Sequence, residues 1–299
     1  MTDGAQVQRI VLAGASGTIG GAVASALDSD GHAVTCLSRA DFVDAATLSE
    51  TVAEAKPDTV ISCIASRSGS PKDAQAVDYR ANANLLAAAK QAEAEHFILL
   101  SAICVQRPKL AFQHAKLAFE AELQSNGIDW TIIRPTAFFK SLSGQVERVR
   151  NGKPYLLFGD GELTRCKPIS DADLARFVAG CVTQKGRRNR VLPIGGPGPA
   201  ISPREQGEML FALTGQRPRY RSISPALFRA ASMVLSLGAP ISDWFAEKAE
   251  YARIAHYYAT ESMLVFDPET GAYSEDTTPE FGGETLRDHY RKLLERKAV

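Results

Sequence analysis

Short apolar runs alternate with longer segments of helical periodicity through the first half of the chain. Such runs are typical of buried parallel strands, and apolar residues three and four positions apart are typical of helices that cover a sheet. The predicted strands are Arg9–Ala13, Ala33–Leu37, Asp58–Ile64, His96–Ser101 and Asp129–Arg134, and the predicted helices are Thr18–Leu27, Ala74–Ala94 and Gln113–Gln124. This order predicts an α/β fold with a Rossmann-like, doubly wound parallel sheet.

The regular alternation ends near Pro135. We therefore expect an NADP-binding domain over residues 1–135 and a smaller C-terminal substrate lobe over residues 136–299. Val191–Ile194 is apolar enough to return to the main sheet, near residues 190–195. Ser170-Asp171 and the Ser-Pro pairs at 202–203 and 224–225 are predicted to begin helices.

One further pairing is expected inside the lobe. Tyr155–Phe158 and Leu163–Lys167 flank the turn residues Gly159-Asp160-Gly161. Two short apolar runs around such a turn predict a β-hairpin.

A glycine motif joins the first predicted strand to the first predicted helix. It reads Gly14-Ala15-Ser16-Gly17-Thr18-Ile19-Gly20, or G-x-x-G-x-x-G. Gly14 permits a tight turn, Gly17 permits a pyrophosphate to approach the backbone, and Gly20 permits close packing of the helix on the sheet. Because a helix N-terminus also favours phosphate, the motif predicts a dinucleotide site.

The end of the second strand indicates which dinucleotide is bound. An acidic residue there would bind the ribose 2′-hydroxyl of NAD, whereas a cation favours the 2′-phosphate of NADP. The residues present are Ser38 and Arg39, with Asp41 beyond the strand end. We therefore expect NADPH. Ala65 and Ser66 after the third strand, and Pro135 after the fifth, are also expected to contact it.

Candidate reaction chemistry follows the fourth strand. Ser101 ends this strand, and the next helix carries Phe112 and Lys116 four positions apart, on one helical face. The spacing resembles the Ser and Tyr-x-x-x-Lys of short-chain dehydrogenase/reductases, but Phe112 stands at the tyrosine position. Because phenylalanine has no ionisable proton, carbonyl reduction and sugar epimerisation are disfavoured. Reduction of a conjugated C=C bond remains, with Lys116 and Ser101 as the candidate catalytic residues.

Longer stretches around these residues resemble the divinyl chlorophyllide a 8-vinyl reductase family. They include Leu99–Pro108, Phe112–Leu123, Arg134–Leu142, Phe158–Gly161, Cys166–Ser170 and Leu192–Pro197. The resemblance implies NADPH-dependent reduction of the 8-vinyl group of a Mg-containing divinyl (proto)chlorophyllide to ethyl, in chlorophyll or bacteriochlorophyll biosynthesis. It also implies an atypical, isoflavone-reductase-like member of the superfamily, with the lysine retained and the tyrosine absent.

The implied pigment is large, flat and apolar, and carries a carboxylate or an ester. Phe112, Phe138 and Phe139 are candidates for contact with the ring, and Lys140 is a candidate for a propionate. The phenylalanines at 138 and 139 serve equally well as lobe core. No residue is assigned to a metal.

Composition narrows the alternatives. Lys+Arg and Asp+Glu both number 34, so the net charge of zero argues against nucleic acid as a partner. No apolar run is long enough for a transmembrane segment, and the N-terminus lacks the pattern of a secretory signal or transit peptide. We expect a cytoplasmic bacterial protein with room for peripheral contact with a photosynthetic membrane. The five cysteines are isolated and predict free thiols.

Two other functions remain open. One is a non-catalytic NADP-sensing or assembly protein on the same fold, against which Lys116 argues. The other is a reductase of a different conjugated alkene.

Overall fold

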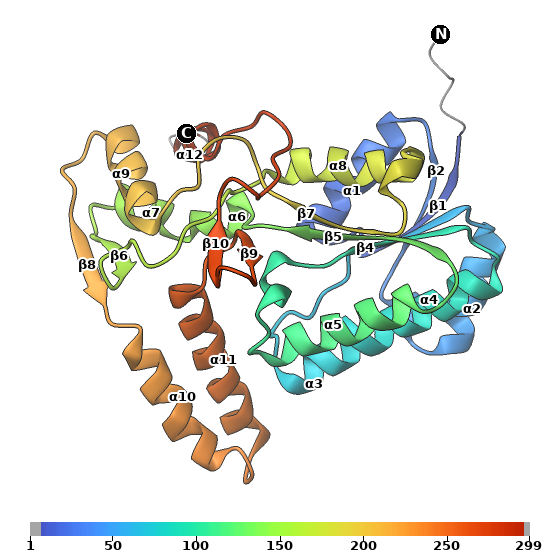
Figure 1. Ribbon diagram of the computed structural model, residues 1–299, viewed down its shortest axis with the longest axis horizontal. Helices are drawn as coiled ribbons and strands as arrows, with labels where there is room; N and C mark the ends of the chain where they lie inside the picture. The colour runs from blue at the N-terminus through green and yellow to red at the C-terminus, as the bar shows by residue number, and fades with distance from the viewer. Residues whose placement is uncertain (1–6, 296–299) are drawn as a thin grey trace. The chain divides into compact units, whose positions relative to one another are not determined.

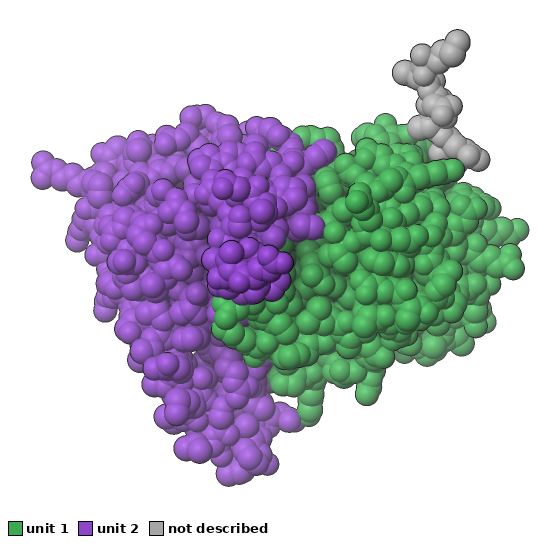
Figure 2. Space-filling view, viewed as in Figure 1, with its two compact units in different colours: residues 1–134, 171–192 green, residues 135–170, 193–299 purple. Residues whose placement is uncertain are grey.

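The structure, a computed structural model, describes residues 7–295. The prediction about a leader concerns the N-terminal residues, of which residues 1–6 lie outside the described ones. Figure 2 colours the two compact units of the chain. The first holds the residues up to Arg134 together with Asp171–Leu192, and the second holds Pro135–Ser170 together with the residues from Pro193 onward. The expected single boundary at residue 135 thus differs from the observed division, because α8 (Asp171–Thr183) packs against α1 (Thr18–Ser29).

A six-stranded sheet forms the centre of the first unit, in the order β2-β1-β3-β4-β5-β7 (Figure 1). The strands are β1 (Arg9–Ala13), β2 (Ala33–Leu37), β3 (Thr59–Ser62), β4 (His96–Leu100), β5 (Asp129–Pro135) and β7 (Arg190–Ile194). From β2 to β5 all neighbouring pairs are parallel. This arrangement confirms the predicted Rossmann-like architecture. The chain runs from β1 outward to β2 on one side and then continues from β3 on the other side of β1, and folds of this type bind ligands at that change of direction, at the carboxyl ends of β1 and β3.

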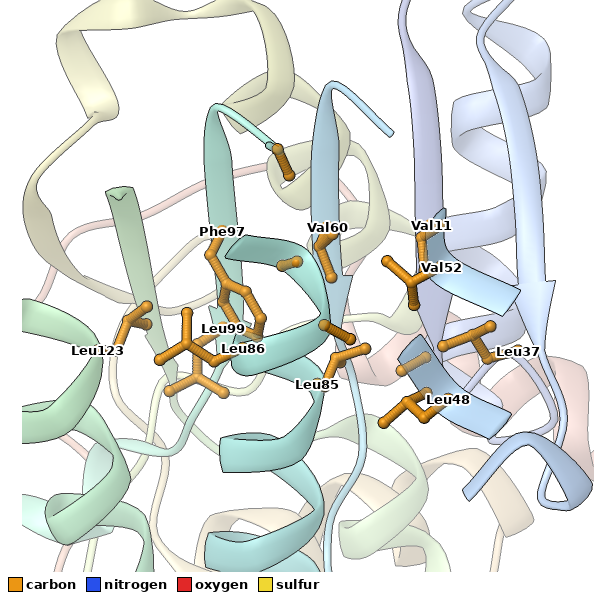
Figure 3. Packing of buried hydrophobic residues seen from close by; sticks show 14 of the residues in the cluster. Val11, Leu37, Leu48, Val52, Val60, Leu85, Leu86, Phe97, Leu99 and Leu123 are labelled. Carbon is orange, nitrogen blue, oxygen red and sulfur yellow. The ribbon is translucent and has the colours of Figure 1, made fainter. Parts of the chain in front are cut away.

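Helices cover both faces of this sheet because its strands are apolar on both sides. Figure 1 places α1 and α8 on one face and α2 (Ala45–Ala55), α4 (Asn82–Gln91) and α5 (Ala111–Gln124) on the other. Figure 3 shows strand side chains such as Val60 and Phe97 packed against Leu85 and Leu86 of α4. The predicted helix Ala74–Ala94 is made of α4 and a preceding π-helical segment, Ala74–Ala81, which continues from the short α3 (Pro71–Asp73).

The second unit contains ten α-helices and β-strands among the residues that the structure describes. They are α6 (Phe139–Leu142), α7 (Val146–Arg150), β6 (Tyr155–Phe158), α9 (Pro203–Thr214), β8 (Tyr220–Ile223), α10 (Ala226–Gly238), α11 (Asp243–Thr260), β9 (Val265–Asp267), β10 (Ala272–Ser274) and α12 (Leu286–Glu295). Of these, α6, α7, β6, α9, β8 and α12 contribute to the apolar core of this unit, whose buried residues include Phe139, Tyr155, Phe211 and Tyr290. Ser202 caps α9 through a capping box with Glu205, as the Ser-Pro pair predicts.

The predicted hairpin over Tyr155–Lys167 is wrong. The turn itself forms, since the Gly161 amide donates to the Phe158 carbonyl at 3.0 Å. However, β6 pairs in parallel with β8, and Cys166 bridges to Ile201 and Met263 instead. The local turn signal is overridden because pairing with β8 lets β6 bury Tyr155 in the core of this unit.

The antiparallel helices α10 and α11 lie side by side in Figure 1 and form a helical hairpin. Large exposed apolar side chains concentrate here: Leu227, Met233, Val234, Leu237, Ile241, Trp244, Phe245, Tyr251 and Tyr258. Within residues 7–295, no helix has the length and apolar character needed to span a bilayer.

Candidate cofactor and reaction site

Three glycines shape the turn from β1 into α1. Gly14 has a φ of +91°, and a Cβ there would lie 2.8 Å from the carbonyl group of Cys63, just after β3. A Cβ on Gly20 would lie 2.1 Å from the Gly14 carbonyl oxygen. The Gly17 amide donates to that same oxygen at 2.9 Å. Glycine is therefore required at 14 by conformation and at 20 by the closeness of helix and turn.

The start of α1 suits a phosphate group. Gly17 precedes the helix in an extended conformation, and among the described residues no side chain caps this end and no acid stands in its first turn. Ser16, Gly17 and Thr18 are exposed, flanked by the half-buried Ala15 and Ile19. Backbone amides and the positive end of the helix dipole thus face the predicted pyrophosphate position. The residues present fit a dinucleotide.

Arg39 and Asp41 both follow the end of β2. The side chain of Arg39 is exposed, as expected for contact with a 2′-phosphate. Asp41 accepts hydrogen bonds from the Ser38 hydroxyl at 2.8 Å and from the Ser38 amide at 2.6 Å, and these bonds lower the pKa of its carboxyl. The proton of the Ser38 hydroxyl therefore points to Asp41, a partner that the sequence reasoning did not foresee.

Residues after β3 line the edge of the same site. Burial raises the pKa of the Cys63 thiol to about 12, so this cysteine is a neutral thiol and no nucleophile. Ala65 is exposed and Ser66 is half-buried. Small side chains here leave the strand tips open, as a crossing cofactor requires.

Lys116 forms a buried ion pair that sequence reasoning missed. Its Nζ lies 2.9 Å from Oδ1 of Asp78, and the two side chains are 10% and 0% exposed. The Ser66 amide donates to the same Oδ1 at 3.3 Å. Of the predicted residues, Ser66 and Lys116 are thus brought together through Asp78. The sequence signal that could have revealed this partner of Lys116 is the acidic Asp78, which stands in an otherwise Ala-rich predicted helix, four positions before Asn82.

Ser101 belongs to a second buried network. Its hydroxyl donates to Oε1 of Glu120 on α5, and the Glu120 carboxylate pairs with Arg134 at the end of β5. Glu120 is 2% exposed, so this carboxylate is shielded from solvent. The predicted catalytic Ser101 therefore has its proton engaged by a carboxylate within the first unit, while its oxygen can still accept a hydrogen bond.

The face of α5 that carries Lys116 also carries Phe112, one turn earlier. Phe112 is half-buried and His114 is exposed. Between them, Gln113 is fully buried and holds the helix start, accepting from the Lys109 and Leu110 amides and donating to the Cys104 carbonyl. The position at which the resemblance leads us to expect a tyrosine is thus occupied by a partly accessible apolar ring.

The remaining predicted residues lie in the second unit. Pro135 is buried at the end of β5. Phe139 is 3% exposed within the core of that unit and lies 5.3 Å from the His289 ring, which favours the core interpretation for it. Phe138 is half-buried and Lys140 is exposed.

The chain is similar to known proteins along most of its length. A protein-family model described as NAD(P)H-binding matches residues 14–185, more than half of the chain. Divinyl chlorophyllide a 8-vinyl-reductase, chloroplastic, of Arabidopsis thaliana is 52% identical over 243 residues, which cover 79% of this chain and 58% of that protein. The protein of the same name from Oryza sativa subsp. indica is 43% identical over 95% of this chain and 78% of its own length.

The fold has solved counterparts. The NADPH-dependent quinone oxidoreductase QOR2 of Escherichia coli, crystallised with NADPH, superposes with a TM-score of 0.66 over 95% of this chain and 99% of that chain. At 17% identity this likeness concerns the fold. The matched family model, described as NAD(P)H-binding, is the finding that confirms the prediction of a nicotinamide dinucleotide cofactor.

Proposed function

We propose that this chain, which belongs to the divinyl chlorophyllide a 8-vinyl reductase family within the NAD(P)H-binding proteins, reduces the 8-vinyl group of a divinyl chlorophyllide to ethyl. The chain spans 58% of the length of the Arabidopsis relative. The observation that carries the proposal is a buried, charged Lys116 beside the cofactor edge of the sheet, with Phe112 where a proton-donating phenol would otherwise stand.

The cofactor of the proposal is NADPH. When bound, it supplies a hydride from its nicotinamide ring. Gly14 to Gly20 would hold the pyrophosphate, Arg39 and Ser38 the 2′-phosphate, and Ala65, Ser66, Lys116 and Pro135 the nicotinamide half. Because Asp41 competes for the Ser38 hydroxyl, Arg39 carries most of the preference for NADPH over NADH.

The reaction needs one hydride and one proton. Hydride addition to the terminal vinyl carbon breaks the C=C π bond and places the electron pair on the neighbouring carbon, where the macrocycle delocalises it. Lys116, directly or through water, then gives a proton to that carbon, which completes the ethyl group and leaves a neutral amine that is reprotonated from solvent. Delocalisation lowers the demand for a strong acid, so the absence of a phenol at Phe112 is tolerated.

The substrate side of the proposal rests on aromatic and basic residues. In the first unit, Phe112 offers a partly accessible ring for stacking on a flat macrocycle. In the second unit, Phe138 offers another such ring, and the exposed Lys140 suits a propionate. Phe139 lies in the buried core of the second unit. Chlorophyllide and protochlorophyllide differ outside the vinyl group, so both belong in the substrate panel.

The proposed location is the cytoplasm of a bacterial phototroph that makes chlorophyll or bacteriochlorophyll, in peripheral contact with the photosynthetic membrane. The α10–α11 hairpin supports the contact, since residues 230–242 carry no charge and include the exposed Leu237 and Ile241. Lys248 lies 5.9 Å from the Trp244 ring and 5.4 Å from the Tyr251 ring, and such a band of aromatic and cationic side chains is typical of a membrane interface.

Flotation with phospholipid vesicles tests the contact. We expect the double variant L237S/I241S to lose co-flotation, whereas V43S/L163S, which changes exposed apolar residues elsewhere, should float like the wild type. Equal flotation of the two variants, or no flotation of the wild type, would remove this part of the proposal.

The decisive experiment for the reaction is conversion of divinyl to monoethyl pigment by the purified protein with NADPH, followed by absorbance. We expect K116A to lose turnover while it still binds NADPH measurably. The control variant K90A changes an exposed helix lysine that is bonded to Asn126, and it should keep its turnover. Full activity of K116A would refute the role of Lys116. NADPH binding without turnover of any alkene would favour a sensing or assembly role, and turnover of other alkenes alone would favour a different reductase.

A further inference from the structure

Asp78 is a fully buried carboxylate that the proposed reaction does not use. Its Oδ1 receives the Ser66 amide at 3.3 Å and the Lys116 ammonium at 2.9 Å. Its Oδ2 is buried and, within residues 7–295, has no hydrogen-bond partner. A buried carboxylate with half of its acceptor capacity unused is costly, so its presence calls for a reason other than stability.

The backbone around Asp78 is fixed to the sheet. Asp78 lies in the π-helical segment Ala74–Ala81, and wide turns of this kind are frequent at functional sites. Nδ2 of Asn82 donates to the Asp78 carbonyl at 3.1 Å, and Oδ1 of Asn82 accepts from the Ser62 hydroxyl of β3 at 2.5 Å. This chain of hydrogen bonds ties the backbone of Asp78 to β3, and the Ser66 amide, beyond the end of β3, donates to its carboxylate.

The position of the Lys116 side chain depends on its ion pair with Asp78. Its side chain is long and flexible, and within the described part of the chain Asp78 is the acidic group paired with its ammonium. An ammonium has three N–H donors. With one of them directed at Asp78, the others remain for a ligand at the sheet edge.

We infer that Asp78 is the positioning residue of Lys116: it orders the ammonium at the cofactor edge of the sheet so that the free N–H groups meet hydroxyls of the bound dinucleotide and then the reacting carbon. This inference deepens the proposed function and rests on it for the last step. Binding of NADPH needs no pigment, so NADPH affinity tests the effect of Asp78 on Lys116 even if the pigment is not reduced.

The test is a double-mutant cycle read by NADPH affinity and by turnover. We expect D78N to weaken NADPH binding about tenfold, the equivalent of one charge-assisted hydrogen bond, and to lower kcat more than it raises KM for the pigment. In the K116A background the same substitution should change NADPH affinity less than about twofold, because the group that Asp78 orders is absent. D78E should recover part of the loss, since it restores a carboxylate one methylene away.

D58N is the matched control, because Asp58 also pairs with a cation, Arg9, but at an exposed site. It should leave affinity and turnover unchanged. Equal weakening of NADPH binding by D78N in both backgrounds would mean a merely structural role and would overturn the inference. If D78N does not fold, D78E carries the test: wild-type affinity and turnover in D78E would overturn it, and a partial loss of both would support it.

Discussion

Adding one methyl group at Gly20 tests the geometry of the cofactor turn. The new Cβ of G20A would lie 2.1 Å from the Gly14 carbonyl oxygen and 2.6 Å from its carbon. Both are backbone atoms, so no side chain can rotate away. Because non-bonded atoms prefer separations of about 3.5 Å, α1 and the turn must separate by more than about 1 Å.

The magnitude follows from two opposing terms. Overpacking of this kind costs about 1–3 kcal/mol, and the better helix propensity of alanine offsets about 0.5–1 kcal/mol of it. We therefore expect the free energy of unfolding to fall by about 1–2 kcal/mol, which lowers the melting temperature by a few degrees. NADPH affinity should fall by at least about tenfold, because the displaced turn is the one that faces the pyrophosphate.

The neighbouring residue supplies the control. A Cβ on Gly21 would lie 3.3 Å from the Ala15 carbonyl oxygen, so a shift of a few tenths of an ångström accommodates it. G21A should keep NADPH affinity and match or exceed the wild type in stability. Urea unfolding and NADPH fluorescence titration measure both quantities. If G20A equals G21A in both, the close packing of helix and turn does not constrain the site.

Three further predictions concern other parts of the first unit. R39A should lower the preference for NADPH over NADH about tenfold in fluorescence titrations, and D41N should raise it, because Asp41 is a negative group beside the phosphate position. E120Q should lower the free energy of unfolding by about 2–4 kcal/mol in urea titrations, because it leaves the cation of Arg134 without its buried partner. Burial lowers the pKa of His96 to about 4, below its ordinary value of 6.5. Between these two pH values the histidine is therefore protonated in the unfolded chain and neutral in the folded chain. Unfolding free energy should therefore fall by up to about 3 kcal/mol between pH 6.5 and 4, and H96Q should remove that slope. Wild-type behaviour of R39A or E120Q, or an unchanged slope in H96Q, would contradict the respective reasoning.

Local signals in the sequence predicted the sheet and the cofactor turn. Apolar runs such as Arg9–Ala13 have few alternatives to a buried strand, and the spacing of Gly14, Gly17 and Gly20 is dictated by a turn within one segment. Lys116 was found because its spacing from Phe112 resembles a known helical motif. All of these depend on residues close together along the chain.

The features that were missed depend on distant residues. Asp78 meets Lys116 across 38 positions, and its direction is set by a π-helical turn that apolar periodicity does not reveal. The pairing of β6 with β8 joins segments 65 positions apart, so the nearer Gly159-Asp160-Gly161 turn suggested the wrong partner. Ser101 was identified, but its bond to Glu120 requires knowing how α5 faces β4.

The return of Asp171–Leu192 to the first unit has a consequence for how the protein is made. A ribosome that has released β5 has not yet synthesised β7, which borders β5, or α8, which covers α1. The nascent nucleotide-binding half therefore stays incomplete, with an open sheet edge and an uncovered helix, until Pro135–Ser170 and then Asp171–Leu192 have emerged. A fragment cut at residue 135 would inherit these apolar surfaces and self-associate, whereas one with Asp171–Leu192 joined to it by a short linker would close them.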